Sequence, residues 1–580
     1  MINSIKEKYV SLAIILAGLL PLIYAACSYL PIDLGGDEVH SLKTYSMQGI
    51  AATVTNYFEP NNHVFFNIII SFALKFLGVH DLGGVIDNLV LLRSLQLVFG
   101  ILTFVYVYLF AGRFIGSLAA ILSVVFLSTT IPFLNFAMQL RGYSLSMLLA
   151  AALLFHVSCF AAKPGKFHAA MTALSAFMLF YTIPSNVYFI ISLMVVIGLE
   201  YAARRFMKIP VAGEFSGKPA LFGLLFISIG SLTGLLAYLP LLKQILTNSF
   251  ITQTAGCRFF VLDSLFPGVS SMFLSGRFLL AALAAAGFGI LAFRWLKTKV
   301  ESEGVISFIR LALLYTIPFI VSFARNDLPF DRSFVMLAPV FVLLAASGIT
   351  LFIASLPPLP NIGRIISIVT VLYCLVTFGW MMASIQEVLK NDIAAGIRHH
   401  DLLRIEYLSQ LSTPCTDLKI LAAAYQKEPC PVIIVGNVDR PSVYAYLDKL
   451  NIRNSYAILN FCRDSAHPQN VNFGLRVPDS IGTDHHSILV ALPTAFFKNF
   501  DPSLSLDSPQ LFTPLFIILH ESNYLSGNGN CYVVTDCPSS LISILNRLSD
   551  QFHPVMLNSG TTYHTIFRIS VPDHLDLRSD

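Results

Sequence analysis

Apolar blocks long enough to cross a lipid bilayer recur through most of this sequence. A helix needs about 20 apolar residues to span the hydrocarbon core, where its backbone groups must hydrogen-bond to one another. Hydrophobic residues make up 55% of the 580 residues and charged residues only 12%, whereas about 25% of a soluble protein is charged. The pattern therefore predicts a polytopic α-helical membrane protein.

We expect about eleven spans in the first two thirds of the chain. Their ranges are 9–30, 89–111, 115–133, 143–162, 167–184, 186–203, 219–242, 276–296, 305–324, 333–355 and 363–385. The first span follows a basic start and so resembles a signal peptide, but its length favours an uncleaved helix. The apolar segment 64–77 is too short to span, and we expect it to lie at the interface or to re-enter.

The distribution of Lys and Arg predicts the orientation of these spans, because cytoplasmic loops are rich in both. With the N-terminus in the cytoplasm, the basic residues near 6–8, 113, 163–166, 204–218, 294–299 and 364 lie inside. The outer side then holds the large loop 31–88, the turns near 135–142 and 184–186, the loops 243–275 and 325–332, and everything after 386. The formal net charge of +4 is too small to indicate nucleic acid as a partner.

Residues 386–580 differ from the rest, because their apolar runs have the length of strands. The runs are 431–436, 487–492, 515–520, 531–536 and 564–570, with helix-like segments such as 440–450 and 538–549 between them. This alternation predicts a C-terminal α/β domain outside the membrane, after a transmembrane domain of residues 1–385. Five cysteines lie in the tail, and their pairing stays open: Cys415, Cys430, Cys462, Cys531 and Cys537.

Two adjacent carboxylates, Asp37 and Glu38, follow the first apolar run at the start of the large outer loop. A carboxylate in a partly dry pocket can accept the proton of an attacking hydroxyl group. The alternative is that both are solvated loop charges, as acidic residues usually are. Their neighbours Asp33 and His40 are expected to be structural.

Two amides and an imidazole, Asn61, Asn62 and His63, stand directly before the apolar segment 64–77. Such groups can hydrogen-bond a sugar or orient a carboxylate, but Asn is also an ordinary turn residue. A single His in this stretch does not indicate a metal site.

Arg141 and Tyr143 lie at the outer boundary of the span 143–162. An Arg there can bind a lipid phosphate through several N–H donors. The alternative is that Arg141 reaches to the interface only to keep its charge in water, with Tyr143 as an aromatic belt residue.

Arg325 and Arg332 lie on the same predicted side, just before the span 333–355. Either could contact a phosphate, as Arg141 could. Asp327 and Asp331 are close enough in sequence to pair with these cations instead.

All four segments fall on the outer face under an orientation derived from basic residues alone. Together they would supply acid–base groups and cations where the headgroup of a polyprenyl phosphate lies. This combination favours an enzyme over a purely structural membrane protein.

The ordered motifs resemble those of the glycosyltransferase C (GT-C) superfamily, especially family 39, the protein O-mannosyltransferases, and its bacterial relatives. The stretch "GGDEVHS" (35–41) resembles the first-loop Asp-Glu motif, and "NNHVFFNIII" (61–70) resembles the "H-P-P-L-Y" type of segment. Further along, "QLRGYSLSMLL" (139–149) resembles an "ARxYAL" stretch, and "DRSFVMLAP" (331–339) resembles "pRYxxxxxP". The resemblance covers roughly residues 1–385.

This resemblance implies a polyprenyl- or dolichyl-phosphate-linked sugar as donor and inverting transfer on the non-cytoplasmic face. Asp37 would be the general base, Glu38 the second acidic residue, and Arg141 and Arg332 would handle the donor phosphate. The sequence departs from the family pattern at Asn62, where relatives often have Pro, and at 333–334.

A phosphate ester leaves readily, so a metal is not obligatory, and a divalent cation stays open as a cofactor. The acceptor, a lipid, a polysaccharide or a protein, is not readable from the sequence, nor is the sugar. By analogy with bacterial relatives, we expect the bacterial inner membrane, with the tail in the periplasm.

Two other functions remain to be weighed against this one. A transporter or flippase for a lipid-linked or small polar substrate would place ionisable residues inside the spans, where Arg93 is the clearest case. A non-catalytic assembly or acceptor-binding protein would act through the tail and would not need Asp37.

Overall fold

The structure is a computed structural model. It describes residues 15–16, 18–27, 30, 34–57, 60–207, 217–248, 258–275, 281–282, 284–289, 303–326, 329, 331–355, 362–387, 414–427, 432–435, 449, 456–463, 471–476, 487–491, 530–535, 553–557 and 565–570. Several expectations therefore lie outside the described residues. These are the structural role of Asp33, the pairing of Asp327, most of the span 276–296, the run 515–520, and the helices at 440–450 and 538–549.

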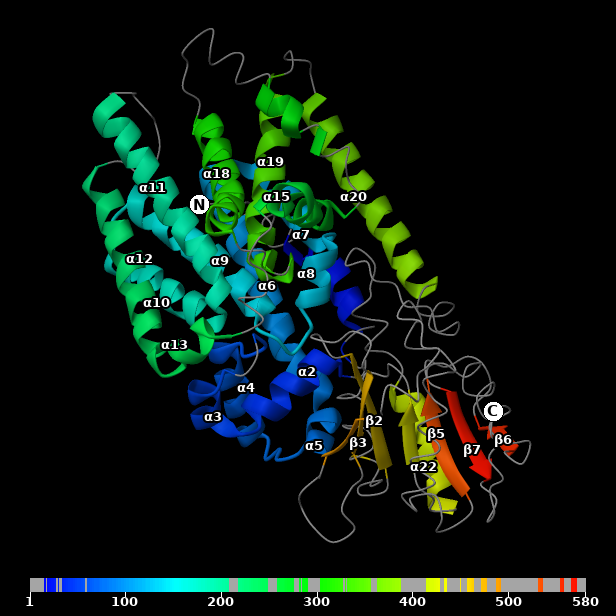
Figure 1. The fold of residues 1–580 in the computed structure, drawn as a ribbon. Coiled ribbons are helices and arrows are strands. Elements are labelled where there is room, and N and C mark those ends of the chain that lie inside the picture. The colour runs from blue at the N-terminus through cyan, green and yellow to red at the C-terminus, as the bar shows by residue number, and fades with distance from the viewer. Residues whose placement is uncertain are drawn as a thin grey trace. The chain divides into compact units, whose positions relative to one another are not determined.

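The chain divides into a helical unit of residues 1–31, 40–81 and 87–384, and a second unit of residues 32–39, 82–86 and 385–580. The helices, drawn in Figure 1, are α2 (Gly36–Ser41), η1 (Leu42–Ser46), α3 (Gly49–Thr55), α4 (Val64–Phe76), α5 (Leu82–Asp87), α6 (Leu89–Phe114), α7 (Ser117–Ser128), α8 (Ile131–Phe136), α9 (Tyr143–Ala162), α10 (Lys166–Thr182), η2 (Pro184–Asn186), α11 (Val187–Met207), α12 (Lys218–Ala237), α13 (Leu239–Leu246), α15 (Arg258–Phe260), η3 (Val261–Leu265), α16 (Phe266–Leu274), α18 (Glu303–Arg325), η4 (Asp331–Leu337), α19 (Ala338–Ser355), α20 (Ile362–Glu387) and α22 (Pro414–Lys427).

Six segments in the described part of the chain are long and apolar enough to cross a membrane. They are 89–114, 143–162, 184–203, 218–237, 305–325 and 331–354, and each coincides with an expected span. The segment expected at 115–133 is instead divided between α7 and α8, which are separated at Thr129 and Thr130. The short segment 64–77 forms a helix of 13 residues, α4. The total of about eleven spans stays a prediction.

Helix α9 is the centre of the helical unit. Of its most apolar window, 89% is buried inside the protein, and it packs against α6, α10, α12 and α19. A helix that is apolar all round has no solvent face and belongs in a core or a membrane. The position of α9 therefore fixes that of Tyr143 at its first turn.

Small residues allow α10 and α12 to approach closely, as they do in many membrane bundles. A Cβ atom added at Gly230 would lie 2.1 Å from the carbonyl oxygen of Ala173 and 2.9 Å from the Cβ of Ala176. At Gly234 an added Cβ would lie 2.8 Å from the ring of Phe180. These two glycines, four residues apart, form the α12 side of the contact.

One ion pair joins two of the apolar helices. The guanidinium of Arg310 on α18 donates from Nε to Glu200 Oε1 at 2.7 Å and from Nη2 to Oε2 at 3.1 Å. Both residues lie within expected spans, so they join Arg93 among the few ionisable residues there. The bidentate geometry satisfies both charges inside the bundle.

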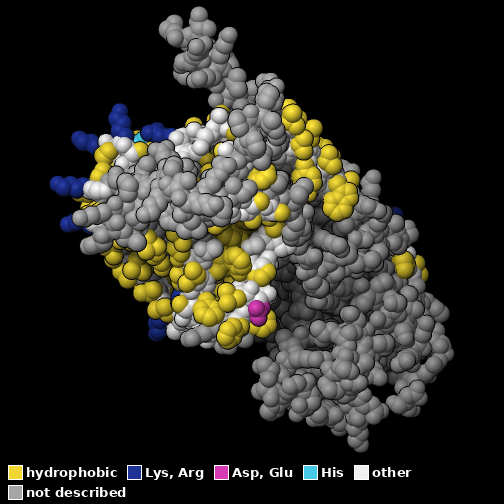
Figure 2. Space-filling model, turned by 90° about the horizontal axis from the view of Figure 1, so that it is seen from above, with side chains coloured by type: hydrophobic (Ala, Val, Ile, Leu, Met, Phe, Trp, Pro, Cys, Tyr) yellow, Lys and Arg dark blue, Asp and Glu magenta, His cyan; other side chains and the backbone are white. Residues whose placement is uncertain are grey.

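The outward faces of several helices carry large apolar side chains. On α12 these include Leu225, Ile229, Leu232 and Leu236, each about half exposed. Figure 2 shows hydrophobic side chains over much of the described surface, with Lys and Arg gathered at one margin. Exposed apolar surface on this scale fits contact with lipid rather than water.

The second unit contains a mixed sheet with the strand order β4-β3-β2-β1-β5-β7-β6. The strands are β1 (Val432–Val435), β2 (Tyr456–Arg463), β3 (Val471–Arg476), β4 (Ser487–Ala491), β5 (Asn530–Thr535), β6 (His553–Met556) and β7 (Thr565–Ser570). The central strand β1 runs parallel to β2 and β5, with Ile433 opposite Ala457 and Val533, and the other pairs are antiparallel. Four expected runs correspond to β1, β4, β5 and β7, and α22 packs against β7.

We predict that Gly230→Ala destabilises the protein, because the new methyl group overlaps the backbone of α10. Overpacking of this kind costs about 1–3 kcal/mol, so the apparent melting temperature in detergent should fall by several degrees. Gly198→Ala on α11 is the matched control, since an added Cβ there meets nothing within 4 Å. Equal melting temperatures for both variants would contradict the close packing of α10 and α12.

Candidate functional site

Arg141 is the buried cation around which the candidate site is built. Only 1% of its surface is exposed. Its Nη2 donates to Asn61 Oδ1 at 2.7 Å, and its guanidinium carbon lies 5.2 Å from the ring centroid of Tyr143. The hydrogen bond and the cation–π contact hold the guanidinium in one orientation. Three residues that the sequence singled out are thus in direct contact.

His63 connects the same loop to the start of α9. The backbone N–H of Gly142 donates to His63 Nδ1 at 2.8 Å, so that nitrogen carries the lone pair and a neutral ring carries its proton on Nε2. The ring also packs edge-on against Tyr143, with the centroids 4.9 Å apart. His63 is therefore buried and held in place by the two residues that follow Arg141, through the backbone of Gly142 and the ring of Tyr143.

Gly142 belongs to this site, although its role could not be anticipated. A Cβ atom there would lie 2.8 Å from Thr182 Cγ2 and 3.0 Å from the Cβ of His63. Its φ angle is −69°, which any residue can adopt. Glycine is needed here because a larger side chain would not fit. The only hint in the sequence was its place between Arg141 and Tyr143.

Asn62 is fully buried and bonded within the protein. Its Nδ2 donates to the carbonyl oxygens of Thr53 and Asn56, both at 2.8 Å, and its Oδ1 accepts from Asn67 Nδ2 at 3.0 Å. These bonds tie the end of α3 to the first turn of α4. They use both donors and one acceptor position of the amide.

The acidic pair lies on α2, whose last residue bonds to the Asn61 backbone. Ser41 Oγ donates to the carbonyl oxygen of Asn61 at 3.2 Å. Glu38 is 1% exposed, and its Oε2 accepts the backbone N–H of Gly35 at 2.9 Å. A side chain that accepts a backbone N–H ahead of its own helix stabilises the helix start. Asp37, one residue earlier, is half-buried.

Two further connecting segments, η2 and η4, lie at the first turn of α9. Asn186 Nδ2 donates to Ser146 Oγ at 2.9 Å, and Ser146 Oγ donates to the Gly142 carbonyl at 2.9 Å. Two residues further on, the ring of Tyr188 lies 5.8 Å from that of Phe334 in η4. The end of α10, η2 and η4 therefore meet at the same end of the bundle as His63.

The segment 325–334 shares this end of the bundle. The guanidinium carbon of Arg325, at the end of α18, lies 5.9 Å from the ring of Tyr188. Arg332 is half-buried in η4, which packs against α9 and η2. The contacts bring Asn61, His63, Arg141 and Tyr143 together directly, and the packing of η4 against α9 and η2 places Arg332 at the same end of the bundle.

Tyr57 is a further buried residue beside the site that the sequence did not single out. Burial, and then the neighbouring phenols of Tyr45 and Tyr143, raise the pKa of its hydroxyl well above the usual range. Its backbone N–H donates to Gln244 Oε1 at 2.5 Å, and Gln244 Nε2 donates to the Thr55 carbonyl at 2.7 Å. Gln244 thus joins the loop between the first two expected spans to α13.

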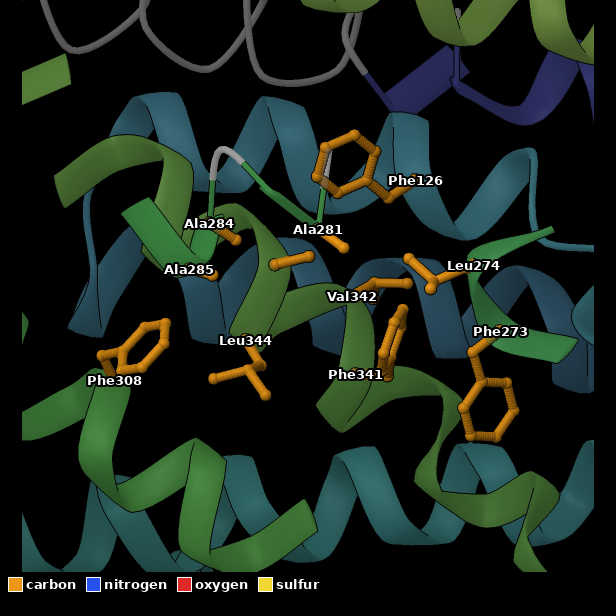
Figure 3. A pocket seen from close by; sticks show the side chains of 11 residues that line it. Phe126, Phe273, Leu274, Ala281, Ala284, Ala285, Phe308, Phe341, Val342 and Leu344 are labelled. Atoms are coloured by element: carbon orange, nitrogen blue, oxygen red, sulfur yellow. The ribbon is translucent and has the colours of Figure 1, made fainter. Parts of the chain in front are cut away.

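An apolar cavity of about 200 Å³ lies elsewhere in the helical unit. Figure 3 shows the rings of Phe126, Phe273, Phe308 and Phe341 around it, with three alanines of the segment 281–285 along one side. All the lining side chains are apolar. Such a space suits a hydrocarbon chain and offers nothing to a sugar.

No group of three or more His, Cys, Asp or Glu side chains that could hold a metal ion occurs among the described residues. The divalent cation that the sequence left open has no ligand set in that part of the chain. Among the described side chains, Cys27 and Cys159 are not joined in a disulfide, and the pairing of the tail cysteines lies outside the described side chains.

No family model and no curated protein matches this chain. Similar solved structures include ArnT from Cupriavidus metallidurans bound to undecaprenyl phosphate, at 11% identity over 96% of this chain and 97% of that chain, with a TM-score of 0.48.

The oligosaccharyltransferase of Archaeoglobus fulgidus is also similar. Its apo form is 11% identical over 93% of this chain and 82% of that chain, with a TM-score of 0.45. A complex of this enzyme, AglB, with an inhibitory peptide and a dolichol-phosphate gives 10% identity over 94% and 81%, with a TM-score of 0.44. ArnT and AglB are GT-C glycosyltransferases, the superfamily that the motifs resemble. Because these identities and TM-scores are low, a function for this chain must rest on its own residues.

We predict that Asn62→Ala destabilises the first outer loop. It removes three hydrogen bonds and leaves buried backbone carbonyls unsatisfied, a loss of at least about 2 kcal/mol. The apparent melting temperature in detergent should fall by about 2 °C or more. Thr55→Ala, at an exposed position of the same loop, is the control and should change the melting temperature by less than about 1 °C. An unchanged value for Asn62→Ala would contradict the network.

Proposed function

We propose that the protein is a membrane glycosyltransferase that moves a sugar from a polyprenyl-phosphate donor to an acceptor hydroxyl on the non-cytoplasmic face. One observation carries the proposal: a buried guanidinium, Arg141, is held by Asn61 and Tyr143 at the end of the bundle that also holds η4. A rigid, desolvated cation stabilises the charge that develops on a departing phosphate.

The proposed reaction exchanges one bond to the anomeric carbon for another. The carboxylate of Asp37 takes the proton of the acceptor hydroxyl, and the acceptor oxygen forms a bond to the anomeric carbon. The bond from this carbon to the phosphate oxygen breaks on the opposite side, and the phosphate keeps the electron pair. Attack opposite the leaving group inverts the anomeric carbon, and no acid is needed because the leaving group is already a phosphate.

The other candidate residues receive roles from their contacts. Glu38 supports the start of α2 and so the orientation of Asp37 beside it. Asn61 positions Arg141 and remains a candidate for a sugar contact, whereas Asn62 and His63 hold the loop in place. Arg332 is the second candidate cation for the phosphate.

The hydrocarbon part of the donor also has a place in this proposal. The helix α19 follows η4 directly and contributes Phe341, Val342, Leu344 and Ala345 to the apolar cavity. A cation in η4 followed by an apolar wall in α19 matches a ligand with a phosphate head and an apolar tail. ArnT and AglB were solved with such lipid phosphates, undecaprenyl phosphate and dolichol-phosphate, and we propose a ligand of this class here.

We also propose that the chain is an integral protein of a bacterial inner membrane. The N-terminus would lie in the cytoplasm and the 386–580 unit in the periplasm, where the acceptor, a lipid, a polysaccharide or a protein, is met. Digestion of the tail by protease added outside sealed inverted inner-membrane vesicles would contradict this orientation.

We predict that Asp37→Asn abolishes sugar transfer, because the amide cannot accept the hydroxyl proton. Transfer from a panel of undecaprenyl-phosphate sugars to membrane acceptors should fall about 10²-fold or more. Asp81→Asn, an exposed carboxylate of the same loop, should leave the rate within about twofold.

Equal rates of sugar transfer by the wild type and Asp37→Asn would show that Asp37 is not the general base. If the wild type showed neither sugar transfer nor donor hydrolysis with any lipid-linked sugar, the proposal of an enzyme would be overturned. A transporter or flippase would then be favoured.

We predict that Arg141→Lys weakens binding of undecaprenyl phosphate about tenfold, because an ammonium cannot keep the flat, multidentate geometry held by Asn61 and Tyr143. The dissociation constant can be measured for the purified protein in nanodiscs. Arg205→Lys, exposed on α11, is the charge-conserving control and should bind as wild type does. Unchanged binding by a folded Arg141→Lys variant would rule out a phosphate contact by Arg141.

A further inference from the structure

A pair of histidines lies on α9 and α10, away from the proposed site. His156 Nδ1 and His168 Nδ1 are 3.0 Å apart, and His156 Nε2 is 3.2 Å from the hydroxyl oxygen of Tyr106 on α6. His156 is separated from Tyr143 by thirteen residues of one helix, a distance of about 20 Å. The pair has no part in the proposed sugar transfer.

The separation of the two nitrogens suits adjacent ligands of one metal ion. Bonds of about 2.05 Å from an ion to two imidazole nitrogens subtend roughly 90° when the nitrogens are 3.0 Å apart. That angle is the one between neighbouring ligands in square-planar and tetragonal sites, which Cu²⁺ and Ni²⁺ prefer. A tetrahedral ion such as Zn²⁺ would need the rings to move apart by a few tenths of an ångström.

The contact with Tyr106 prepares His156 for this role. When Nε2 carries the proton and donates it to the phenol oxygen, Nδ1 keeps its lone pair and points toward His168. A hydrogen bond on the far nitrogen is the usual way in which a ligating histidine is oriented. In the metal-free state the proton between the two Nδ1 atoms belongs to one ring. On binding, the proton of that ring shifts to its own Nε2, so that Nδ1 keeps a lone pair for the metal.

The pair is also accessible from one side. His156 is 3% exposed, whereas His168, in the first turn of α10, is only partly buried. The exposed residues Lys163 and Pro164 lie in the short connection between α9 and α10, whereas the positive charge of Arg113, at the end of α6, acts on His168 and works against a cation. We propose that His156 and His168 bind a divalent transition-metal cation of the Cu²⁺ type, with water completing its coordination.

The test measures Cu²⁺ bound by the full chain, purified without a histidine tag and placed in nanodiscs. Two His-His pairs elsewhere in the sequence also attract Cu²⁺, so the background carries His399→Gln, His400→Gln, His485→Gln and His486→Gln. We expect one equivalent of Cu²⁺ with splitting from two nitrogens in its electron paramagnetic resonance spectrum.

His168→Gln is the main variant, because this residue is partly exposed and its loss is least harmful to folding. Its affinity for Cu²⁺ should fall at least tenfold, and that of Tyr106→Phe about tenfold through the orientation of His156. His80→Ala, an exposed histidine of the first outer loop, should bind as the background does. Unchanged Cu²⁺ affinity in a folded His168→Gln variant, or a spectrum without two-nitrogen splitting, would overturn the proposal.

Discussion

The hydrogen bond from the Gly142 amide to His63 Nδ1 is the contact on which the outer end of the bundle depends. The amide precedes the first turn of α9 and has no acceptor within that helix. In a membrane protein an unsatisfied N–H at this depth is costly, and His63 supplies the acceptor from a segment almost eighty residues earlier. One bond therefore joins the loop between the first two expected spans to the central helix and brings Asn61 within reach of Arg141.

Two kinds of polar chemistry are separated along α9. At its first turn the contacts are amides, a guanidinium and phenols, which suit anions and hydroxyl groups. Toward its other end lie the histidine pair and, on α11 and α18, the ion pair of Glu200 with Arg310. Between them the helix is lined by apolar and small residues, so that its two ends can serve different ligands without sharing side chains.

Sequence reasoning identified the apolar segments well, because bilayer thickness imposes a length that composition alone reveals. It did not foresee the interruption at Thr129 and Thr130, where two side chains bond back to carbonyls of α7 instead of continuing it. In the second unit it missed β2 and β3, whose Asn460, Arg463 and Asn472 interrupt the apolar pattern. Antiparallel pairing of these strands depends on the sheet and not on their own composition.

Within the candidate site, the sequence predicted the types of residue but not which partner each side chain contacts. Asn61 and Asn62 are identical in type and adjacent in sequence, yet one bonds to Arg141 and the other is used within the loop. The difference comes from carbonyl groups of α3, whose positions no local pattern encodes. Likewise, Gly142 looks like a simple turn glycine until the methyl group of Thr182 is seen against it.

The succession of η4 and α19 gives the strongest physical reason to expect an amphiphilic ligand. A soluble sugar phosphate would need a polar pocket on all sides, and the described cavity is lined by apolar side chains alone. Under the proposed function, the phosphate would lie against the buried Arg141 guanidinium, a contact that a hydrocarbon alone would not make. A molecule with an anionic head and an apolar tail, the donor class proposed above, would use both features.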